Sequence, residues 1–318
     1  MEKVIPGTLR EIDRLIPDAL RVAFGIRHRA SLPPDPGQHD EVAAFAAALL
    51  PPRADDPMEC DDIVVVAEEP RGGGDLRMTF ESCYLPDHDE DSHFLHADTN
   101  VMGVADGVGG YRGTGVDASA FSCALMYNAF EELAAAAPGT HVCPRTLLER
   151  AYGKTVASRT PTASTAVIVS LAGRTLKWAY VGDSGFAVFR DGRLLRRSQA
   201  QQFYFNCPFQ LNSASNSTSV SEAAVGEVPV KEGDVVVVGT DGLFDNVSDG
   251  EMERIVGMGT AMGFSPKNMA DVIAGFAYET ARCSYRDTPY SVLSRKETGS
   301  TFTGGKPDDI TVIVAFVV

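Results

Sequence analysis

The stretch Val101-Met102-Gly103-Val104-Ala105-Asp106-Gly107 decides the fold, because it is an apolar strand that ends directly in a carboxylate. The same arrangement returns where Val235–Gly239 leads through one threonine to Asp241, and in reverse where Asp308 precedes the strand from Ile310. A carboxylate at the end of a buried strand is costly unless it is neutralised, and several converging carboxylates repel one another unless a cation lies among them. The sequence therefore predicts a cation site. Oxygen ligands alone select hard ions, Mg²⁺ or Mn²⁺, over zinc.

A simpler interpretation exists for each site taken alone, because Asp-Gly is a common turn dipeptide. The acidic run Asp87–Asp91, which follows the strand ending near Tyr84, is by itself best explained as a solvated turn. Four such sites in one chain favour the cation site instead. The glycines after Asp106 and Asp241 also leave room for a backbone carbonyl to turn toward an ion.

Composition narrows the class of protein. The chain has 318 residues, 44% of them hydrophobic, which suffices for one large domain or two small ones with a sizeable core. Its net charge of -15 argues against nucleic-acid binding, which needs clustered lysine and arginine. No apolar run approaches the ~20 residues that a membrane span requires. Six widely spaced cysteines without a Cys-x-x-Cys pair argue against a thiolate zinc site and are ordinary for a reduced intracellular protein.

The first 60 residues differ from the rest of the chain. They are rich in proline around one alanine-rich helical stretch, Glu41–Leu50. We interpret residues 1–60 as an N-terminal extension and residues 61–318 as one catalytic domain. Arginines near the N-terminus are mixed with acidic residues and no apolar signal stretch accompanies them, which argues against a transit or secretory peptide.

From residue 62 onward, short apolar or alternating runs predict strands. They lie at Ile63–Ala67, Arg77–Tyr84, Val101–Ala105, Ala166–Leu171, Leu176–Val181, Phe186–Phe189, Asp234–Gly239 and Ile310–Val318. Tight turns such as Arg190-Asp191-Gly192-Arg193 indicate antiparallel hairpins. Two polar stretches, Asn212–Ser221 and Ser284–Gly305, are predicted to be long loops that contact the substrate.

Helical patterns come in pairs between these strands. The pairs are Val116–Ala137 with Arg145–Val156, and a helix from the capping box at Ser248 to Met258 with a helix from Ser265 to about Cys283. This order does not suit repeated β-α-β units. It predicts an α+β fold, a four-layer α-β-β-α sandwich of two stacked antiparallel sheets flanked by helix pairs. The carboxylates at the strand ends would form the cation site at one edge of the sandwich.

Six ordered motifs resemble one family of enzymes. They are Glu90-Asp91-Ser92, Val104–Gly110, Ser164-Thr165-Ala166, Val181–Ser184, Gly239–Asn246 and Lys306–Val312. Together they resemble the type 2C metal-dependent serine/threonine protein phosphatases, over about residues 60–318. The stretch Gln201–Leu211 is similar to the organellar branch of that family, which includes mitochondrial matrix phosphatases and a plastid phosphatase acting on photosystem II core proteins.

The resemblance implies a set of metal ligands. Asp106 would bridge two ions, Mg²⁺ or Mn²⁺, and the Gly107 carbonyl would complete one of them. Asp241 and Asp308 would bind the other ion. The family mechanism then implies a metal-bridging water that attacks phosphorus in line, without a phosphoenzyme.

The other matched residues would surround these ligands. Glu90 and Asp91 would hold metal-bound waters, and Asp183 would share a weaker third ion with Asp241.

The sequence departs from the family at two positions. Val108 stands where many relatives have a histidine proposed as the general acid, and Pro86 stands where many have a phosphate-binding arginine. Neither role is assigned to any of the neighbouring candidates, which are Arg77, His88, His93, His96 and Arg112.

The sequence thus predicts a phosphatase of phosphoserine and phosphothreonine whose partner is a phosphorylated protein, with no nucleic acid and no membrane span. A monomer is favoured. Two alternatives stay open: a catalytically silent scaffold of the same fold, against which the retained ligand set argues, and a two-metal nuclease, against which the acidic balance argues. The expected location is intracellular; the branch resemblance suggests mitochondrion or plastid, and the cytoplasm stays open.

Overall fold

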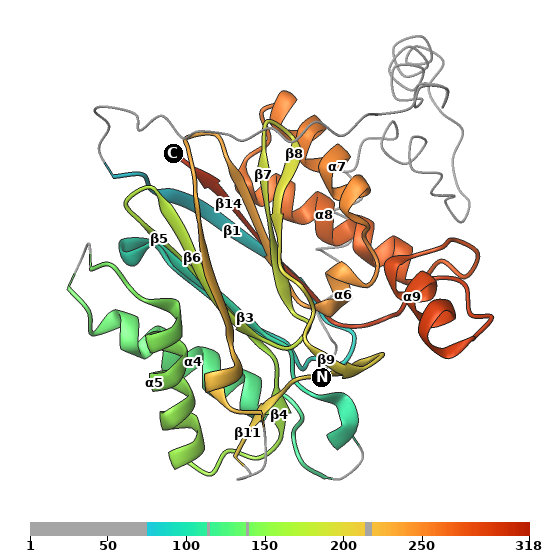
Figure 1. Cartoon of the computed structure of the whole chain (residues 1–318), viewed down its shortest axis with the longest axis horizontal. Coiled ribbons are helices and arrows are strands. Elements are labelled where there is room, and N and C mark those ends of the chain that lie inside the picture. The colour runs from blue at the N-terminus through green and yellow to red at the C-terminus, as the bar shows by residue number, and fades with distance from the viewer. Residues whose placement is uncertain (1–74, 113–114, 138–139, 214–217) are drawn as a thin grey trace, which may run out of the picture. The chain divides into compact units, whose positions relative to one another are not determined.

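Two five-stranded antiparallel sheets form the centre of the fold (Figure 1). The computed structural model describes residues 75–112, 115–137, 140–213 and 218–318. The predicted extension, its helix Glu41–Leu50 and the predicted strand Ile63–Ala67 lie outside the described residues, so the boundary near residue 60 stays a prediction. Residues 75–318 form one compact unit.

The strand order is simple in both sheets. The first sheet has the order β1 (Met78–Leu85), β14 (Ile310–Val317), β13 (Val235–Gly239), β7 (Gly185–Arg190) and β8 (Arg193–Arg197). The second sheet has the order β12 (Ala224–Pro229), β6 (Thr175–Val181), β5 (Ala166–Ala172), β3 (Val101–Ala105) and β2 (Ser92–His96). All pairings within these two sheets are antiparallel, as predicted.

The predicted hairpin turn between β7 and β8 is confirmed. Arg190 pairs with Arg193, and the two residues between them, Asp191 and Gly192, have φ values of 51° and 75°. Two successive positive φ values make a turn whose twist matches that of the strands, and Asp-Gly tolerates it best.

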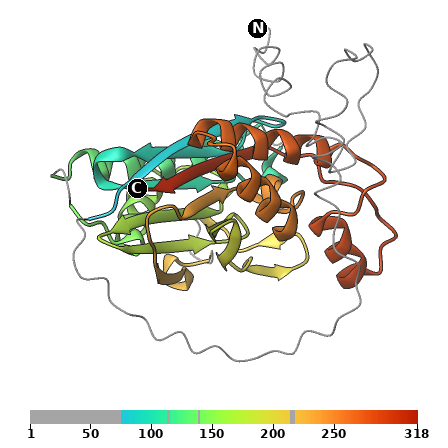
Figure 2. The same cartoon turned by 90° about the horizontal axis from the view of Figure 1, so that it is seen from above.

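Helix pairs cover the outer faces of both sheets (Figures 1 and 2). The helices α4 (Ala120–Ala134) and α5 (Pro144–Ala157) pack on the second sheet, and α7 (Asp249–Ala261) and α8 (Pro266–Ala281) pack on the first. The capping box predicted at Ser248 and the proline in the first turn of α8 are both present. The predicted four-layer sandwich is confirmed. No helix in the described ranges is long and apolar enough to span a bilayer.

Shorter elements complete the described chain. They are α6 (Asp241–Phe244), α9 (Pro289–Thr298), the short strands β4 (Ala163–Ser164), β9 (Gln202–Tyr204), β10 (Cys207–Pro208) and β11 (Leu211–Asn212), and 3-10 turns at Ala97–Thr99, Gly109–Tyr111 and Val220–Glu222. The predicted loop Asn212–Ser221 contains one end of β11 and the start of the last turn, and residues 214–217 are not described.

The prediction of a loop over Ser284–Gly305 is wrong, because α9 lies inside it. Thr288 and Ser291 form a capping box at its start, Pro289 occupies the first turn, and Gly299 ends the helix with a φ of 68°. These are strong helix signals, but the polar surface of the helix hides them from a search for apolar periodicity.

The strands β2, β8 and β12 were not predicted. All three lie at sheet edges, where one side of the strand meets solvent and polar residues are tolerated. In β12 the burial alternates strictly between half-buried and exposed residues. The central strand β13, in contrast, is buried along its whole length, since the second sheet covers one face and helices cover the other.

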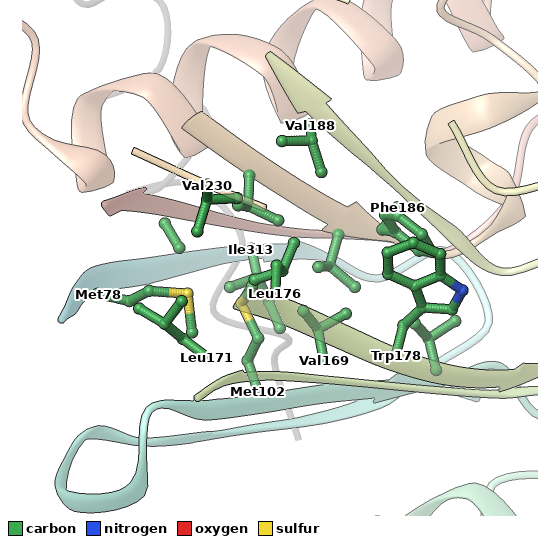
Figure 3. Close-up of a cluster of buried hydrophobic side chains, with 14 of the residues drawn as sticks. Met78, Met102, Val169, Leu171, Leu176, Trp178, Phe186, Val188, Val230 and Ile313 are labelled. Carbon is green, nitrogen blue, oxygen red and sulfur yellow. The ribbon is translucent and has the colours of Figure 1, made fainter. Parts of the chain in front are cut away.

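The main core lies between the sheets. Figure 3 shows side chains from the two sheets pointing toward one another, among them Met102, Leu176 and Trp178 from the second sheet and Phe186, Val188 and Ile313 from the first. The rings of Phe186 and Trp178 lie 4.7 Å apart, centroid to centroid. A second cluster, which includes Phe121, Leu125, Leu148 and Ile168, fixes α4 and α5 to the second sheet.

We expect Phe186→Ala to lower the free energy of unfolding by about 3–5 kcal/mol, because the ring is fully buried and its removal leaves a cavity between the sheets. The matched control is Tyr127→Ala, whose ring is 63% exposed on α4 and whose loss should change stability by no more than about 0.5 kcal/mol. Urea denaturation measures both. Equal losses would contradict the inter-sheet packing.

Candidate metal centre

Four predicted ligand residues are brought to one end of the two sheets. Asp106 follows β3, Asp183 lies in the turn from β6 to β7, Asp241 opens α6 after β13, and Asp308 precedes β14. Chain segments more than 200 residues apart in the sequence thus meet at a single edge, as predicted.

A pocket of about 280 Å³ opens at this edge. Its lining includes Asp106, Asp241 and Asp308 together with two cationic side chains, Arg112 and Lys306. Asp183 is not part of this lining, but it is close enough to Asp241 for the charge of Asp241 to raise its pKa. Three of the four predicted carboxylates therefore face one common space.

The glycines after two of these carboxylates are required by close backbone approach. A Cβ atom on Gly107 would lie 2.7 Å from the carbonyl oxygens of Glu90 and Ala118, and a Cβ atom on Gly242 would lie 2.0 Å from the carbonyl oxygen of Asp309. Backbone contacts this short leave no room for a side chain. The Asp-Gly pairs are thus packing requirements of the site as well as turns.

Each of three buried carboxylates presents one oxygen without a protein partner among the described residues. These oxygens are Asp91 Oδ1, Asp183 Oδ1 and Asp241 Oδ1. The three side chains belong to residues that are at least nine-tenths buried. A buried carboxylate oxygen without a partner is costly, so the arrangement fits an additional cation or its bound water.

The second oxygen of each of these carboxylates is held by the protein. Asp91 Oδ2 accepts hydrogen bonds of 2.7 Å from the hydroxyls of Thr240 and Thr311. Asp183 Oδ2 accepts a bond of 2.8 Å from Gln202 Nε2. The hydrogen bonds fix the orientation of both carboxylates, while Asp91 Oδ1 and Asp183 Oδ1 have no partner among the described residues.

Lys306 acts as a cation that is already present in this cluster. Its Nζ lies 2.5 Å from Asp241 Oδ2, 3.0 Å from Asp245 Oδ2 and 3.1 Å from Asp308 Oδ2. Asp241 and Asp308 therefore converge within one ion's reach of a common centre. Burial opposes the charge of Lys306, but the three carboxylates together raise its pKa, so the ammonium persists.

Burial and the crowding of like charges raise the pKa values of several acidic side chains in the site. Burial, followed by the charges of Asp241, Asp91 and other carboxylates nearby, raises the pKa of Asp106 well above its ordinary value. Burial and the charge of Asp241 raise the pKa of Asp183 to about 7. Burial also raises the pKa of Asp308. These carboxyl groups resist ionisation because their negative charges repel one another, and a bound cation would stabilise the ionised form.

Asp309 has a different role from its neighbour Asp308. The backbone N–H groups of residues 87–89 donate to its Oδ1 at 2.5–3.0 Å, and that of Glu90 donates to Oδ2 at 2.7 Å. Burial alone would raise the pKa of Asp309, but these four bonds outweigh it and lower the pKa. Asp309 therefore fixes the acidic turn that leads into Asp91.

Glu90 was predicted to hold a metal-bound water, and in the structure an arginine holds it. Arg112 donates from Nε to Glu90 Oε1 at 2.5 Å and from Nη2 to Oε2 at 2.6 Å. Glu90 is almost fully buried, whereas the side chain of Arg112 is 42% exposed at the pocket. A guanidinium thus stands at the pocket although the usual arginine position is Pro86.

The three neighbouring histidines separate into two groups. His93 bonds Ser82 and His96 bonds Thr99, so both have structural partners away from the pocket. His88 lies 3.7 Å from Asp308 Oδ1. Within the described residues, no group of three or more His, Cys, Asp and Glu side chains is arranged so that it could hold a metal ion.

Buried carboxylates at the edge of a two-sheet sandwich, three of them with one oxygen that has no partner among the described residues, are typical of a metal-dependent hydrolase with an oxygen-lined site. The model of the family described as protein phosphatase 2C matches residues 85–272. A rice protein (Oryza sativa subsp. japonica) named "Putative protein phosphatase 2C 24" is 58% identical over 320 residues, which cover 99% of this chain and 98% of that protein. The chain belongs to the protein phosphatase 2C family and is a metal-dependent serine/threonine protein phosphatase.

Solved structures agree with this assignment. The photosystem II phosphatase PBCP is similar with a TM-score of 0.65 and 30% identity, over 76% of this chain and 99% of that one. The catalytic domain of the serine/threonine phosphatase PstP, in complex with two manganese ions, shares the fold with a TM-score of 0.54 and 20% identity, over 76% of this chain and 99% of that one. The predicted family and its likeness to the photosystem II phosphatase branch are confirmed.

The raised pKa values predict how stability depends on pH without metal. The folded chain keeps protons on Asp183 and Asp245 up to about pH 7, whereas the unfolded chain releases them near pH 4. Because the folded state binds more protons in this window, stability should fall as pH rises from about 4 to about 7, by on the order of 4 kcal/mol for each of the two groups.

Urea denaturation in the presence of a chelator measures this effect. We expect Asp183→Asn to remove part of the fall, since the amide does not titrate. Added Mg²⁺ should stabilise the protein more at neutral than at acidic pH, because protons compete with the ion for the same oxygens. A metal-free protein whose stability rises across this range would contradict the clustering of the carboxylates.

Proposed function

We propose that the chain hydrolyses phosphoserine and phosphothreonine esters of proteins with two Mg²⁺ or Mn²⁺ ions held by Asp106, the Gly107 carbonyl, Asp241 and Asp308. The observation that supports the assignment most strongly is the convergence of Asp106, Asp241 and Asp308 on one pocket. One oxygen of Asp241, Oδ1, is also buried without a partner among the described residues. Bound ions of this kind supply a hydroxide-like water near neutral pH and offset charge on the phosphoryl oxygens.

The protein's own groups position the water and the ester. Asp91, held through Oδ2 by two threonine hydroxyls, presents Oδ1 as a fixed acceptor for a proton of a bound water. Glu90 contributes indirectly, since both of its oxygens bond Arg112. The guanidinium is thereby fixed at the pocket, where its remaining N–H groups can donate to the oxygens of a phosphoryl group.

The leaving alkoxide must obtain its proton without the usual histidine. Val108 lines the pocket at that position and cannot donate a proton. Water entering the open pocket is then the donor, because the lining carboxylates would be ligands of the ions, arginine does not give up its proton, and Lys306 is held by three carboxylates. We infer that the absence of this histidine slows the hydrolysis of esters with good leaving groups less than the hydrolysis of alkyl esters.

The likeness to PBCP, named a photosystem II phosphatase, supports phosphorylated plastid proteins as the substrate class. On the same likeness we propose a plastid location; the mitochondrion and the cytoplasm are the alternatives. The exposed rings of Phe203 and Tyr204 lie in the β9 segment, next to pocket-lining Asn206 and Pro208, and would contact such a substrate.

The first test is hydrolysis of para-nitrophenyl phosphate and of a phosphothreonine peptide. We expect activity that requires Mn²⁺ or Mg²⁺ and falls by about 10²–10³ in kcat in Asp106→Asn and Asp241→Asn, because each change removes charge that faces the ions. Asp98→Asn is the matched control, since Asp98 is an exposed carboxylate in the turn before β3.

The two alternative functions give other results. Metal binding without any turnover would identify a silent scaffold, and turnover of a phosphodiester alone would identify a nuclease. Unchanged activity in both site variants would refute the ligand assignment.

A separate test addresses Arg112. We expect Arg112→Met to raise KM for the phosphopeptide about tenfold, with a smaller effect on kcat, because a cation that contacts the phosphate is lost. Arg77→Met, an exposed arginine elsewhere on the domain, is the control. A variant that loses stability but keeps its KM would show that Arg112 only anchors Glu90.

A further inference from the structure

We propose that the ammonium of Lys306 occupies the cation position beside the two-ion site, so that this chain holds two metal ions and replaces a third by a positive charge of its own. The proposal rests on the two-ion function above and concerns the region where Asp183, Asp241 and Asp245 meet. A third, weaker ion shared by Asp183 and Asp241 is the competing arrangement.

The contacts of Lys306 match the donor capacity of an ammonium group. Three carboxylates, Asp241, Asp245 and Asp308, each place an oxygen within 3.1 Å of Nζ. An ammonium has three N–H donors, so these contacts use all of them. The side chain is only 18% exposed. Lys306 therefore behaves as a fixed component of the carboxylate cluster.

The backbone of Lys306 is held in place independently of its charge. Asn246 Oδ1 accepts from the Lys306 N–H at 2.9 Å, and Asn246 Nδ2 donates to the Lys306 carbonyl at 2.9 Å. Asn246 is fully buried and also donates to the Gly242 carbonyl, which links Lys306 to the turn that carries Asp241. The centroid of the Tyr290 ring lies 5.6 Å from Nζ, so the ring stabilises the ammonium by a cation–π interaction.

The two oxygens of Asp241 divide between two kinds of cation. Oδ2 bonds Lys306, while Oδ1 is buried without a partner in the described part of the chain. One oxygen can thus serve a metal ion while the other serves the ammonium. Because both interactions use one carboxylate, Lys306 adds a positive charge to the site without removing the metal ligand.

The competing arrangement would use Asp183 Oδ1, which also has no partner among the described residues. An ion there would share Asp241 with the ammonium and would lie close to Asp245, which Lys306 already neutralises. Like charges repel strongly at such short range in a partly buried site. On this proposal the ammonium, in place of a third ion, offsets the charge of Asp245 and of Asp241 Oδ2.

Equilibrium dialysis against Mn²⁺ tests the proposal by counting ions per chain. We expect two ions in the wild-type protein up to millimolar Mn²⁺ and three in Lys306→Met, which keeps the length of the side chain and removes the charge. Adding Asp245→Asn to that variant should return the count to two. Lys231→Met is the matched control, because Lys231 pairs with Asp191 at 3.1 Å on an exposed turn, and its count should stay at two.

Three ions in the wild-type protein, or two in a folded Lys306→Met, would overturn the proposal. Should Lys306→Met fail to fold, lysine-ammonium NMR of the wild-type protein decides the question. We expect one slowly exchanging ammonium signal that persists at saturating Mg²⁺; its disappearance on adding Mg²⁺ would overturn the proposal. A wild-type chain that binds no ion at all would instead refute the two-ion function itself, so the two failures are distinguishable.

Discussion

Repulsion among buried carboxylates is the constraint on which the rest of the structure depends. Asp106, Asp183, Asp241 and Asp308 lie at one edge of the sandwich, where burial and mutual repulsion raise the pKa values of Asp106, Asp183 and Asp308. The fold tolerates this charge because hydrogen bonds or an ammonium hold one oxygen of several of these groups. Asp106, Asp241 and Asp308 line the pocket, and preorganised ligands of this kind cost no rearrangement when an ion binds.

The site exists only because the two sheets stack in one register. Asp106 comes from the second sheet, while Asp241 and Asp308 belong to the first. A hydroxyl pair joins the sheets beside them: Thr165 Oγ1 lies 2.6 Å from Ser184 Oγ and also accepts from the Asp106 N–H at 3.1 Å. The inter-sheet core around Phe186 thus determines the distance between the carboxylates, so packing and chemistry are coupled.

Two adjacent aspartates show how local partners set the role of a residue. Asp308 faces the pocket and contacts Lys306, whereas Asp309 accepts four backbone N–H groups of the turn at residues 87–90. Through Asp309, the closing strand of the first sheet orders the segment that carries Glu90 and Asp91. The acidic run Asp87–Asp91, which by itself is best explained as a solvated turn, therefore connects distant parts of the chain.

The sequence by itself determined the four layers, the central strands and the positions of Asp106, Asp241 and Asp308 at strand ends. These features depend on local patterns, since each central strand is an apolar run and an acidic residue lies at its end. It did not determine the edge strands or α9, whose half-exposed surfaces carry a weak periodic signal. Only the tertiary structure decided that Arg112 holds Glu90, that Asp309 holds a turn and that Lys306 joins Asp241, Asp245 and Asp308. Such pairings depend on which side chains meet across the sandwich, and no spacing along the chain encodes that.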